Sequence, residues 1–226
     1  MKLSKGKLAA LIIALVIVID QAVKIWVKTH FYYGQEMEVT PWFRLLFIEN
    51  NGMAFGMELG SKLLLTLFRI IASAAFIYYL WRLRNRDDVP TGYVVCIALI
   101  TAGALGNVID CIAYGLIFNN PMPPQVAQLF PPDGGYSTLF NGRVVDMLYF
   151  PLCEWNWPQW MPIIGGDHFV FFQPIFNIAD ASLSVSVMVL ILFYARHLAT
   201  LTVKDKEEEI VADEEQDNDQ QPASNE

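Results

Sequence analysis

Charged side chains are scarce in this 226-residue chain. Only 17 % of the residues are Asp, Glu, Lys or Arg, whereas 54 % are apolar and the mean hydropathy is +0.37. An ordinary soluble domain carries more charge and less apolar content. The composition therefore disfavours a water-soluble globule, and it excludes disorder for most of the chain.

An excess of positive charge is also missing. The net charge is −8, and the segment 204–226 alone holds ten acids and two lysines, so residues 1–203 are neutral overall. Nucleic-acid binding needs a basic surface, and we expect no such partner. The segment 199–226 is polar and has no apolar period, which predicts a disordered appendage.

Motifs for nucleophilic or metal catalysis are absent from the sequence. The three cysteines, at positions 96, 111 and 153, fit neither a metal knuckle nor a disulfide framework. The chain contains no G-x-S-x-G and no H-E-x-x-H, and its three histidines offer no evident partner base. We therefore expect no metal and no cofactor, which leaves carboxylates as the candidate catalytic groups.

Four apolar stretches are long enough to cross a bilayer, which takes about 20 helical residues. They run over residues 8–27, 63–81, 92–114 and 176–197. The first resembles a signal peptide, but the sequence after Asp20 is a poor cleavage site, so we expect a retained helix. The predicted fold is an all-α polytopic membrane protein built on a bundle of four transmembrane helices.

The distribution of Lys and Arg predicts the orientation. Nine of the 15 bases lie at the N-terminus, in the 82–86 link or after the fourth span. With four spans these regions share one side, which should be the cytoplasm. The connections 28–62 and 115–175 would then lie outside.

The outer connections are not plain linkers. Residues 43–48 form a strand-like run, followed by a turn at Asn50-Asn51-Gly52. The segment 119–175 holds nine of the 12 prolines and three tryptophans. Loops of this length are usually functional or disordered. An aromatic belt on the membrane surface and a substrate lid both fit this composition.

Polar residues from separate segments are predicted to meet at one depth, near the outer leaflet. They are Asp20, Asn50, Asn107, Asp110, Asp146, Asn177 and Asp180. Four acids in one such layer are costly unless they serve a function. Two close carboxylates share a proton, so one can activate water while the other acts as an acid.

Other interpretations of these acids remain open at this point. Asp20 and Lys24 are four residues apart on one helix face and fit a structural ion pair. Asp110 fits a cap or bridge at a helix end. A small proton-coupled carrier would also place acids within its membrane spans.

Five short blocks, in order along the chain, carry a resemblance to a known family. They are DQAVK (20–24), NNGMAFG (50–56), GNVID (106–110), GRVVD (142–146) and FNIAD (176–180). Over residues 8–198 the chain resembles the lipoprotein signal peptidases, also called signal peptidase II. Each block lies where that family has it relative to the four spans.

The resemblance implies an aspartic endopeptidase of the bacterial inner membrane. Such an enzyme removes the signal peptide from diacylglyceryl-modified prolipoproteins, cleaving before the lipidated Cys, near the periplasmic leaflet. By resemblance Asp146 and Asp180 form the catalytic dyad, and the chain works as a monomer among membrane lipids without a metal. It further implies a small outer β-structured cradle at about 42–59. The resemblance also assigns substrate-positioning roles to Asp20, Asn50, Gly52, Asn107, Asp110 and Asn177.

Two features depart from the family pattern. Position 111 is Cys where the family usually has Arg, and we expect Arg143 to take over that contact with the substrate. A catalytically inactive relative that only binds lipoproteins is the alternative that this difference raises. The outer stretches are also longer than usual. We therefore expect four parts, namely 1–114, an outer loop 115–175 that carries one catalytic Asp and forms a lid or membrane-surface element, 176–198 and 199–226.

Overall fold

The computed structural model describes residues 3–51, 62–197 and 200, so Gly52 and the rest of its turn lie outside the described residues. Four helices of the described part are long and apolar enough to cross a membrane. They are α1 (Lys5–His30), α2 (Lys62–Leu83), α3 (Thr91–Ile109) with its continuation η1 (Asp110–Tyr114) and α4 (Gly115–Ile117), and α5 (Ile178–Val189) with its continuation η2 (Leu190–Tyr194). The predicted four-span fold is confirmed.

The chain divides into two compact units, Met1–Ser186 and Val187–Glu226. The first unit contains α1 to α4, all the described strands and the first part of α5. The described part of the second unit is the end of α5 and η2. Every residue of the candidate site lies in the first unit.

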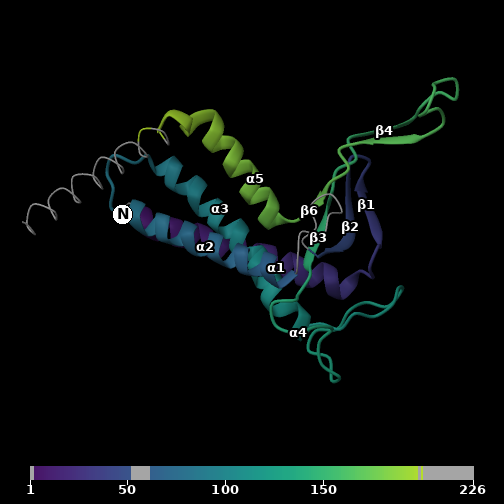
Figure 1. Cartoon of the computed structure of the whole chain (residues 1–226), viewed down its shortest axis with the longest axis horizontal. Coiled ribbons are helices and arrows are strands. Elements are labelled where there is room, and N and C mark those ends of the chain that lie inside the picture. The colour runs from purple at the N-terminus through teal and green to yellow at the C-terminus, as the bar shows by residue number, and fades with distance from the viewer. Residues whose placement is uncertain (1–2, 52–61, 198–199, 201–226) are drawn as a thin grey trace, which may run out of the picture. The chain divides into compact units, whose positions relative to one another are not determined.

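Helix α3 is the central helix of the first unit, and both α1 and α2 pack against it (Figure 1). Most of the α3 span is buried, whereas α1 and α2 expose many large apolar side chains, as expected for helices that face lipid. Gly103 and Gly106 let α5 approach α3 closely. A Cβ at Gly103 would lie 2.4 Å from the Ala179 carbonyl oxygen, and one at Gly106 would lie 2.9 Å from the Ala179 Cβ.

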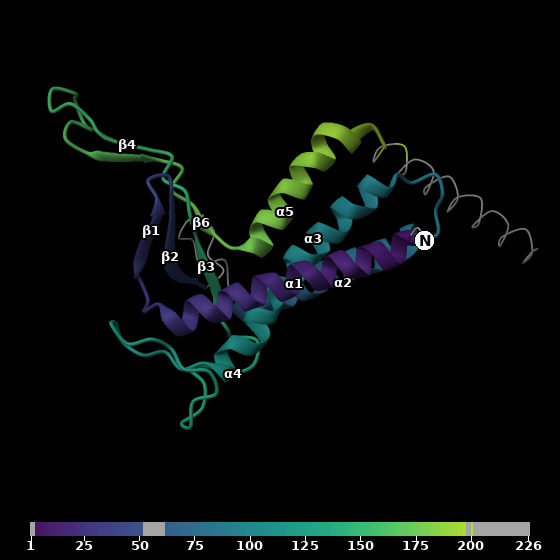
Figure 2. The same cartoon turned by 180° about the vertical axis from the view of Figure 1, so that it is seen from behind.

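A four-stranded antiparallel sheet lies at the end of α1 opposite the N-terminus (Figures 1 and 2). Its strands, in spatial order, are β1 (Glu36–Thr40), β2 (Phe43–Asn50), β3 (Val144–Tyr149) and β6 (Ile175–Phe176). The strand-like run at 43–48 is therefore confirmed as part of β2. An irregularity between Leu45 and Ile48 sets the register that places Ile48 opposite Asp146.

An apolar core fills the space between this sheet, α1 and the end of α3. It contains Val27, Phe31, Phe47, Tyr114, Phe118, Ala127, Val145 and Met147. Part of the long outer loop is built into this core, because Ala127 is buried there and the Tyr136 amide donates to the Phe118 carbonyl at 2.8 Å. This part of the loop thus has a packing role in addition to any role as a lid.

The second part of the outer loop forms a separate two-stranded hairpin. Strand β4 (Cys153–Asn156) pairs with β5 (His168–Phe171), as Figure 1 shows. The rings of Trp155, Trp157 and Phe169 pack against one another along it. Two of the three tryptophans of the loop thus form one aromatic group with Phe169 at this hairpin, whereas Trp160 is largely exposed.

Candidate active site

Asp146 lies in the middle of β3, at the place where the sheet meets the transmembrane helices. Its side chain is buried, with 2 % of the residue exposed. Its Oδ1 accepts a hydrogen bond of 2.7 Å from Asn177 Nδ2, and the Asn50 side chain provides a further hydrogen bond. Two segments far apart in the sequence therefore supply donors to this one carboxyl group.

Asp180 lies in the first turn of α5, next to the residue that caps this helix. Asn177 Oδ1 accepts a hydrogen bond from the backbone N–H of Asp180 at 2.9 Å. The backbone N–H of Asn177 in turn donates to Asp180 Oδ2 at 3.5 Å. This is the reciprocal arrangement of a capping box. It places the Asp180 carboxyl group at the positive end of the helix dipole, which favours the charged form.

Asn107 connects the Asp180 carboxylate to a buried lysine. Its Nδ2 donates to Asp180 Oδ1 at 2.7 Å, and its Oδ1 accepts from Lys24 Nζ at 2.9 Å. An ammonium group can only donate. The Asn107 oxygen must therefore face Lys24, which leaves the amide NH₂ to face Asp180.

Lys24 is the centre of a buried charge network behind the two aspartates. Its ammonium group is fully buried and forms ion pairs with Asp20 Oδ2 at 2.9 Å and with Asp110 Oδ2 at 2.8 Å. Together with Asn107 these acceptors use all three of its N–H donors. A buried charge is tolerated only when it is paired and hydrogen-bonded in this way.

Each carboxylate of this network holds the residue that immediately precedes one of the two central aspartates. Asp20 Oδ1 accepts from the backbone amide of Ala179 at 2.9 Å, and Ala179 precedes Asp180. Asp110 Oδ2 accepts from the backbone amide of Val145 at 3.3 Å, and Val145 precedes Asp146. The network therefore holds both backbones in place relative to α1 and α3.

The structure brings together all seven of the polar residues that the sequence singled out. Asn50, Asn107, Asn177, Asp146 and Asp180 form one hydrogen-bonded group, and Asp20 and Asp110 lie behind it. The predicted ion pair of Asp20 with Lys24 is confirmed. What sequence reasoning missed is that Lys24 serves two acids at once; its spacing from Asp20 was the only local signal.

Position 111, where Cys replaces the usual Arg, faces an arginine from another helix. Arg69 of α2 donates from Nη1 to the Cys111 Sγ at 3.1 Å. Arg143 lies elsewhere, because its Nη1 binds Glu49 Oε2 at 2.9 Å and Asn120 Oδ1 at 3.3 Å. The cation beside position 111 is therefore Arg69, and the contact of Arg143 with the substrate stays a prediction.

The surroundings of Asp146 favour its protonated form. The pKa of Asp146 is raised from 3.8 to about 7, mainly by burial and also by the nearby charge of Asp180. The hydrogen bonds from Asn177 and Asn50 and the charge of Lys24 oppose the rise. Two adjacent carboxyl groups can act as an acid and a base at neutral pH when one of them holds a proton.

Among the described residues, no group of three His, Cys, Asp or Glu side chains is placed to hold a metal ion. The acids around Lys24 have the lysine and backbone amides as their partners. Taken together, the fold and this site define a membrane protein of four helices with two carboxyl groups hydrogen-bonded to asparagines where the four-stranded sheet meets the helices.

Comparison with known proteins identifies the family. Residues 12–196 match the family model of signal peptidase II, and the chain belongs to this family of bacterial membrane peptidases. It is 50 % identical to the lipoprotein signal peptidase of Porphyromonas gingivalis over 200 residues, 88 % of each chain. It is 36 % identical to that of Amoebophilus asiaticus over 184 residues, 79 % of this chain and 73 % of the relative.

A solved structure described as a bacterial membrane enzyme shares the fold. Its TM-score is 0.54 and its sequence identity is 28 %, with 84 % of this chain and 94 % of that chain covered. A second structure with the same description has a TM-score of 0.54 and 25 % identity. The family and the fold therefore agree with the resemblance that the five sequence blocks carry.

Proposed function

We propose that this chain is an aspartic endopeptidase that removes the signal peptide from diacylglyceryl-modified prolipoproteins, cleaving before the lipidated Cys. The observation that carries the proposal is the pair Asp146 and Asp180, which share Asn177 as a hydrogen-bond partner. Membership of the signal peptidase II family supplies the substrate class. The aspartic catalytic type and the assignment of Asp146 and Asp180 as catalytic residues are part of the proposal.

Within the dyad we assign the proton to Asp146 and the negative charge to Asp180. Burial raises the pKa of Asp146 to about 7. Asp180 accepts from Asn107 Nδ2 and lies at a helix N-terminus, and both features favour a carboxylate. The proton belongs to the coupled pair, and the assignment describes where it resides for most of the time.

The proposed reaction is a hydrolysis without a covalent intermediate. The Asp180 carboxylate takes a proton from water, and the resulting hydroxide attacks the scissile carbonyl carbon while protonated Asp146 donates to the carbonyl oxygen. A tetrahedral gem-diol forms. The C–N bond then breaks as the nitrogen receives the proton held by Asp180 and Asp146 takes back a hydroxyl proton of the gem-diol, which releases the amino group of the lipidated Cys and the carboxyl end of the signal peptide and restores both aspartates.

The remaining asparagines would keep this pair aligned during the reaction. Asn177 and Asn50 donate to Asp146, and Asn107 donates to Asp180. An alignment that is set before the substrate arrives saves the cost of reorganisation in the transition state. Because these three residues are hydrogen-bonded to the dyad, we assign them to orienting it.

The proposal places the dyad near the outer leaflet of the inner membrane, with both termini in the cytoplasm. The support is the gathering of nine of the 15 Lys and Arg residues in the three regions on one side. The substrate would enter sideways from the bilayer, with its signal helix and acyl chains in lipid. We propose that the enzyme works as a monomer.

The test is a gel-shift cleavage assay on a diacylglyceryl-modified prolipoprotein in detergent, with a chelator present. Asp146→Asn and Asp180→Asn are each expected to lower the rate of cleavage by at least about a thousandfold. The two carboxyl groups act as a unit, so the loss of one removes most of the catalytic effect of both. Asp133→Asn, in an exposed outer loop, is the matched control and should cleave like the wild type.

Each contrary result has a distinct meaning. Cleavage by either dyad variant at the wild-type rate would refute the dyad assignment. A chelator that abolishes cleavage would refute the metal-free mechanism. If the folded wild type cleaves nothing, the chain is the inactive lipoprotein-binding relative, and the proposed function is wrong.

A further inference from the structure

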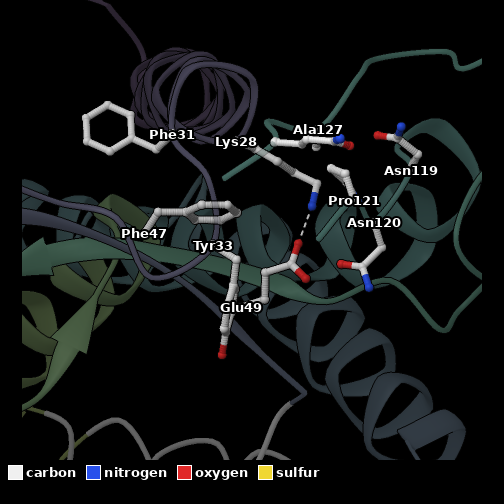
Figure 3. Close-up of a pocket in the computed structure, with 10 residues that line it drawn as sticks. Lys28, Phe31, Tyr33, Phe47, Glu49, Asn119, Asn120, Pro121 and Ala127 are labelled. Carbon is white, nitrogen blue, oxygen red and sulfur yellow. Dashed lines mark hydrogen bonds and ion pairs between the residues drawn. The ribbon is translucent and has the colours of Figure 1, made fainter. Parts of the chain in front are cut away.

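A second buried ion cluster lies in the outer part of the molecule, away from Lys24 and its acids. Lys28 in the last turns of α1 pairs with Glu49 Oε1 of β2 (Figure 3). Glu49 Oε2 binds Arg143 Nη1 at 2.9 Å, just before β3 begins. The side chains of Lys28 and Glu49 are only 2 % and 3 % exposed. The mechanism proposed above uses none of these three groups.

Aromatic rings surround the Lys28 end of this cluster, whereas the Arg143 side chain is 32 % exposed. The Lys28 ammonium lies 5.7 Å from the Phe47 ring centre, 5.1 Å from Phe118 and 5.3 Å from Tyr136. The Arg143 guanidinium also lies over Tyr136, at 5.0 Å. Cations over ring faces gain further stabilisation when water is excluded.

The cavity beside the cluster is too small for a ligand. Its volume is about 10 Å³, and it is lined by Lys28, Glu49 and residues of the outer loop, as Figure 3 shows. Such a space holds about one water molecule. Lys28 and Glu49 therefore belong to the buried interior, and the space beside them is not a binding pocket.

Glu49 occupies a special place relative to the dyad. It lies between Ile48, whose strand partner is Asp146, and Asn50, whose side chain is hydrogen-bonded to Asp146. Successive side chains of a strand point to opposite faces. The Glu49 carboxylate therefore points away from the dyad, into the cluster, while its two neighbours face Asp146.

The cluster joins three elements at this point. Lys28 belongs to α1, Glu49 belongs to β2, and Arg143 stands three residues before Asp146 in the chain. The register of two paired strands is set by the contacts that keep them from slipping past each other. A slip of one residue would turn the Asp146 side chain to the other face of the sheet. The cluster opposes such a slip from the face opposite the active site.

We propose that Glu49 is a positioning residue: held between Lys28 and Arg143, its carboxylate fixes β2 against β3 so that the Asn50 amide meets Asp146. This inference rests on the proposed function. Glu49 acts through Asn50, since its carboxylate binds Lys28 and Arg143 on the other face of the sheet.

The expected signature is a change at Asp146, seen in the pH profile. The Asn50 hydrogen bond lowers the pKa of Asp146, so its loss should raise that pKa and move the alkaline limb of the profile to higher pH. The charged groups that act on Asp146 from the other elements are Lys24 of α1 and Asp180 of α5, and the change leaves them in place.

The experiment compares Glu49→Gln, Glu49→Asp and Glu154→Gln in the full-length enzyme in detergent. Glu154 is the matched control, because it pairs with Arg44 at 2.9 Å in the same outer region and stands apart from Asn50 along the chain. We expect Glu49→Gln to lower kcat about 10- to 100-fold with KM nearly unchanged, as for a misplaced catalytic group. Its alkaline limb should shift to higher pH, whereas Glu49→Asp and Glu154→Gln should keep the wild-type profile.

A fold defect is separated from the proposed role by a second variant. Glu49→Gln leaves Lys28 and Arg143 without their anion, which destabilises the fold. The double variant Lys28→Gln/Glu49→Gln removes both members of the buried pair and avoids an unpaired buried charge on Lys28. The folded double variant should show the same slow kcat and the same shifted limb. A folded variant with a lower melting temperature but a wild-type kcat and profile would overturn the proposal.

A direct titration of Asp146 keeps the inference separate from the proposed function. Carbon-13 NMR of the Asp146 carboxyl group should show a higher midpoint in Glu49→Gln than in the wild type. An unchanged midpoint would overturn the positioning role even in an active enzyme. If the wild type cleaves no prolipoprotein but the midpoint moves, the proposed function fails while the inference about Glu49 stands.

Discussion

Replacing Asp146 by Asn should make the protein inactive and, at alkaline pH, more stable. Asparagine has the same shape, its Oδ1 still accepts from Asn177, and its NH₂ group reproduces the donor of a protonated carboxyl group. The variant therefore mimics the neutral form of Asp146. The substitution removes the free-energy cost of holding a negative charge at this buried position.

The magnitude follows from the pKa of Asp146, which burial raises from 3.8 to about 7. Because the folded-state pKa lies above the unfolded one, the wild type loses stability as the pH rises from about 4 to about 7, and keeps that loss above pH 7. At about 1.4 kcal/mol for each tenfold change in proton affinity, the loss reaches at most about 4 kcal/mol.

The assay is thermal unfolding in detergent at pH 4 and pH 8, for wild type, Asp146→Asn and Asp133→Asn. At pH 8 the melting temperature of Asp146→Asn should exceed that of the wild type by up to about 10 °C, at roughly 2–4 °C per kcal/mol for a chain of this size. At pH 4 the difference should fall below about 1 kcal/mol, because this pH lies close to the unfolded-state pKa of 3.8, where ionisation has only begun to favour the unfolded state.

Two results would refute this reasoning. A difference of equal size at both pH values would mean that the stabilisation has nothing to do with the proton on Asp146. A variant that melts below the wild type at pH 8 would mean that its environment favours the charge. Asp133→Asn should match the wild type throughout, since Asp133 is exposed.

Three further predictions concern the groups around the dyad. Lys24→Met leaves two buried carboxylates without their cation, so we expect a loss of about 3–5 kcal/mol in unfolding free energy and no measurable cleavage. Lys5→Met, at the other end of α1, should lower the unfolding free energy much less. Gly106→Ala puts a Cβ 2.9 Å from the Ala179 Cβ and should cost about 1–3 kcal/mol, whereas Gly6→Ala, with 3.4 Å to its nearest neighbour, should be tolerated in the same melting assay. Finally, kcat/KM measured between pH 5 and pH 9 should fall about tenfold per pH unit above a midpoint near 7, where Asp146 loses its proton; a flat alkaline limb would contradict its role as the acid.

The membrane spans could be predicted from the sequence because their signal is local. The expected stretches 8–27, 63–81, 92–114 and 176–197 each fall on a helix of the structure, although the helices extend a few residues further at most ends. The fourth helix instead starts two residues late, at Ile178, because Ile175 and Phe176 pair with β3 as a strand. Such pairing depends on a partner about 30 residues away, which no local window contains.

The outer sheet was only partly predictable. The run at 43–48 is strongly apolar and indicated a strand, and the structure contains it within β2. Strand β1 reads EMEVT, with mixed charge, and β3 lies next to a turn-rich loop. Both become strands because β2 lies between them and offers a hydrogen-bonding edge on each side.

Among the site residues, Arg143 shows why spacing along the chain is a weak guide. Its position three residues before Asp146 suggested that it replaces the missing arginine at position 111. In the structure its guanidinium group turns to Glu49, and Arg69 from another helix reaches Cys111. A long flexible side chain binds the nearest anion in space, which the sequence does not reveal.

The sequence by itself indicated which segments are long and apolar enough to span a membrane and which polar residues they contain. It could do so because hydropathy and helical rise are properties of each segment alone. The tertiary structure decided how those groups are paired. Lys24 meets Asp110 across two helices, and Asp20 binds the amide of Ala179 from 159 residues away. The proton preference of Asp146 likewise depends on burial by β2, α1 and η1 together, since the cost of a buried charge is set by everything that replaces water around it.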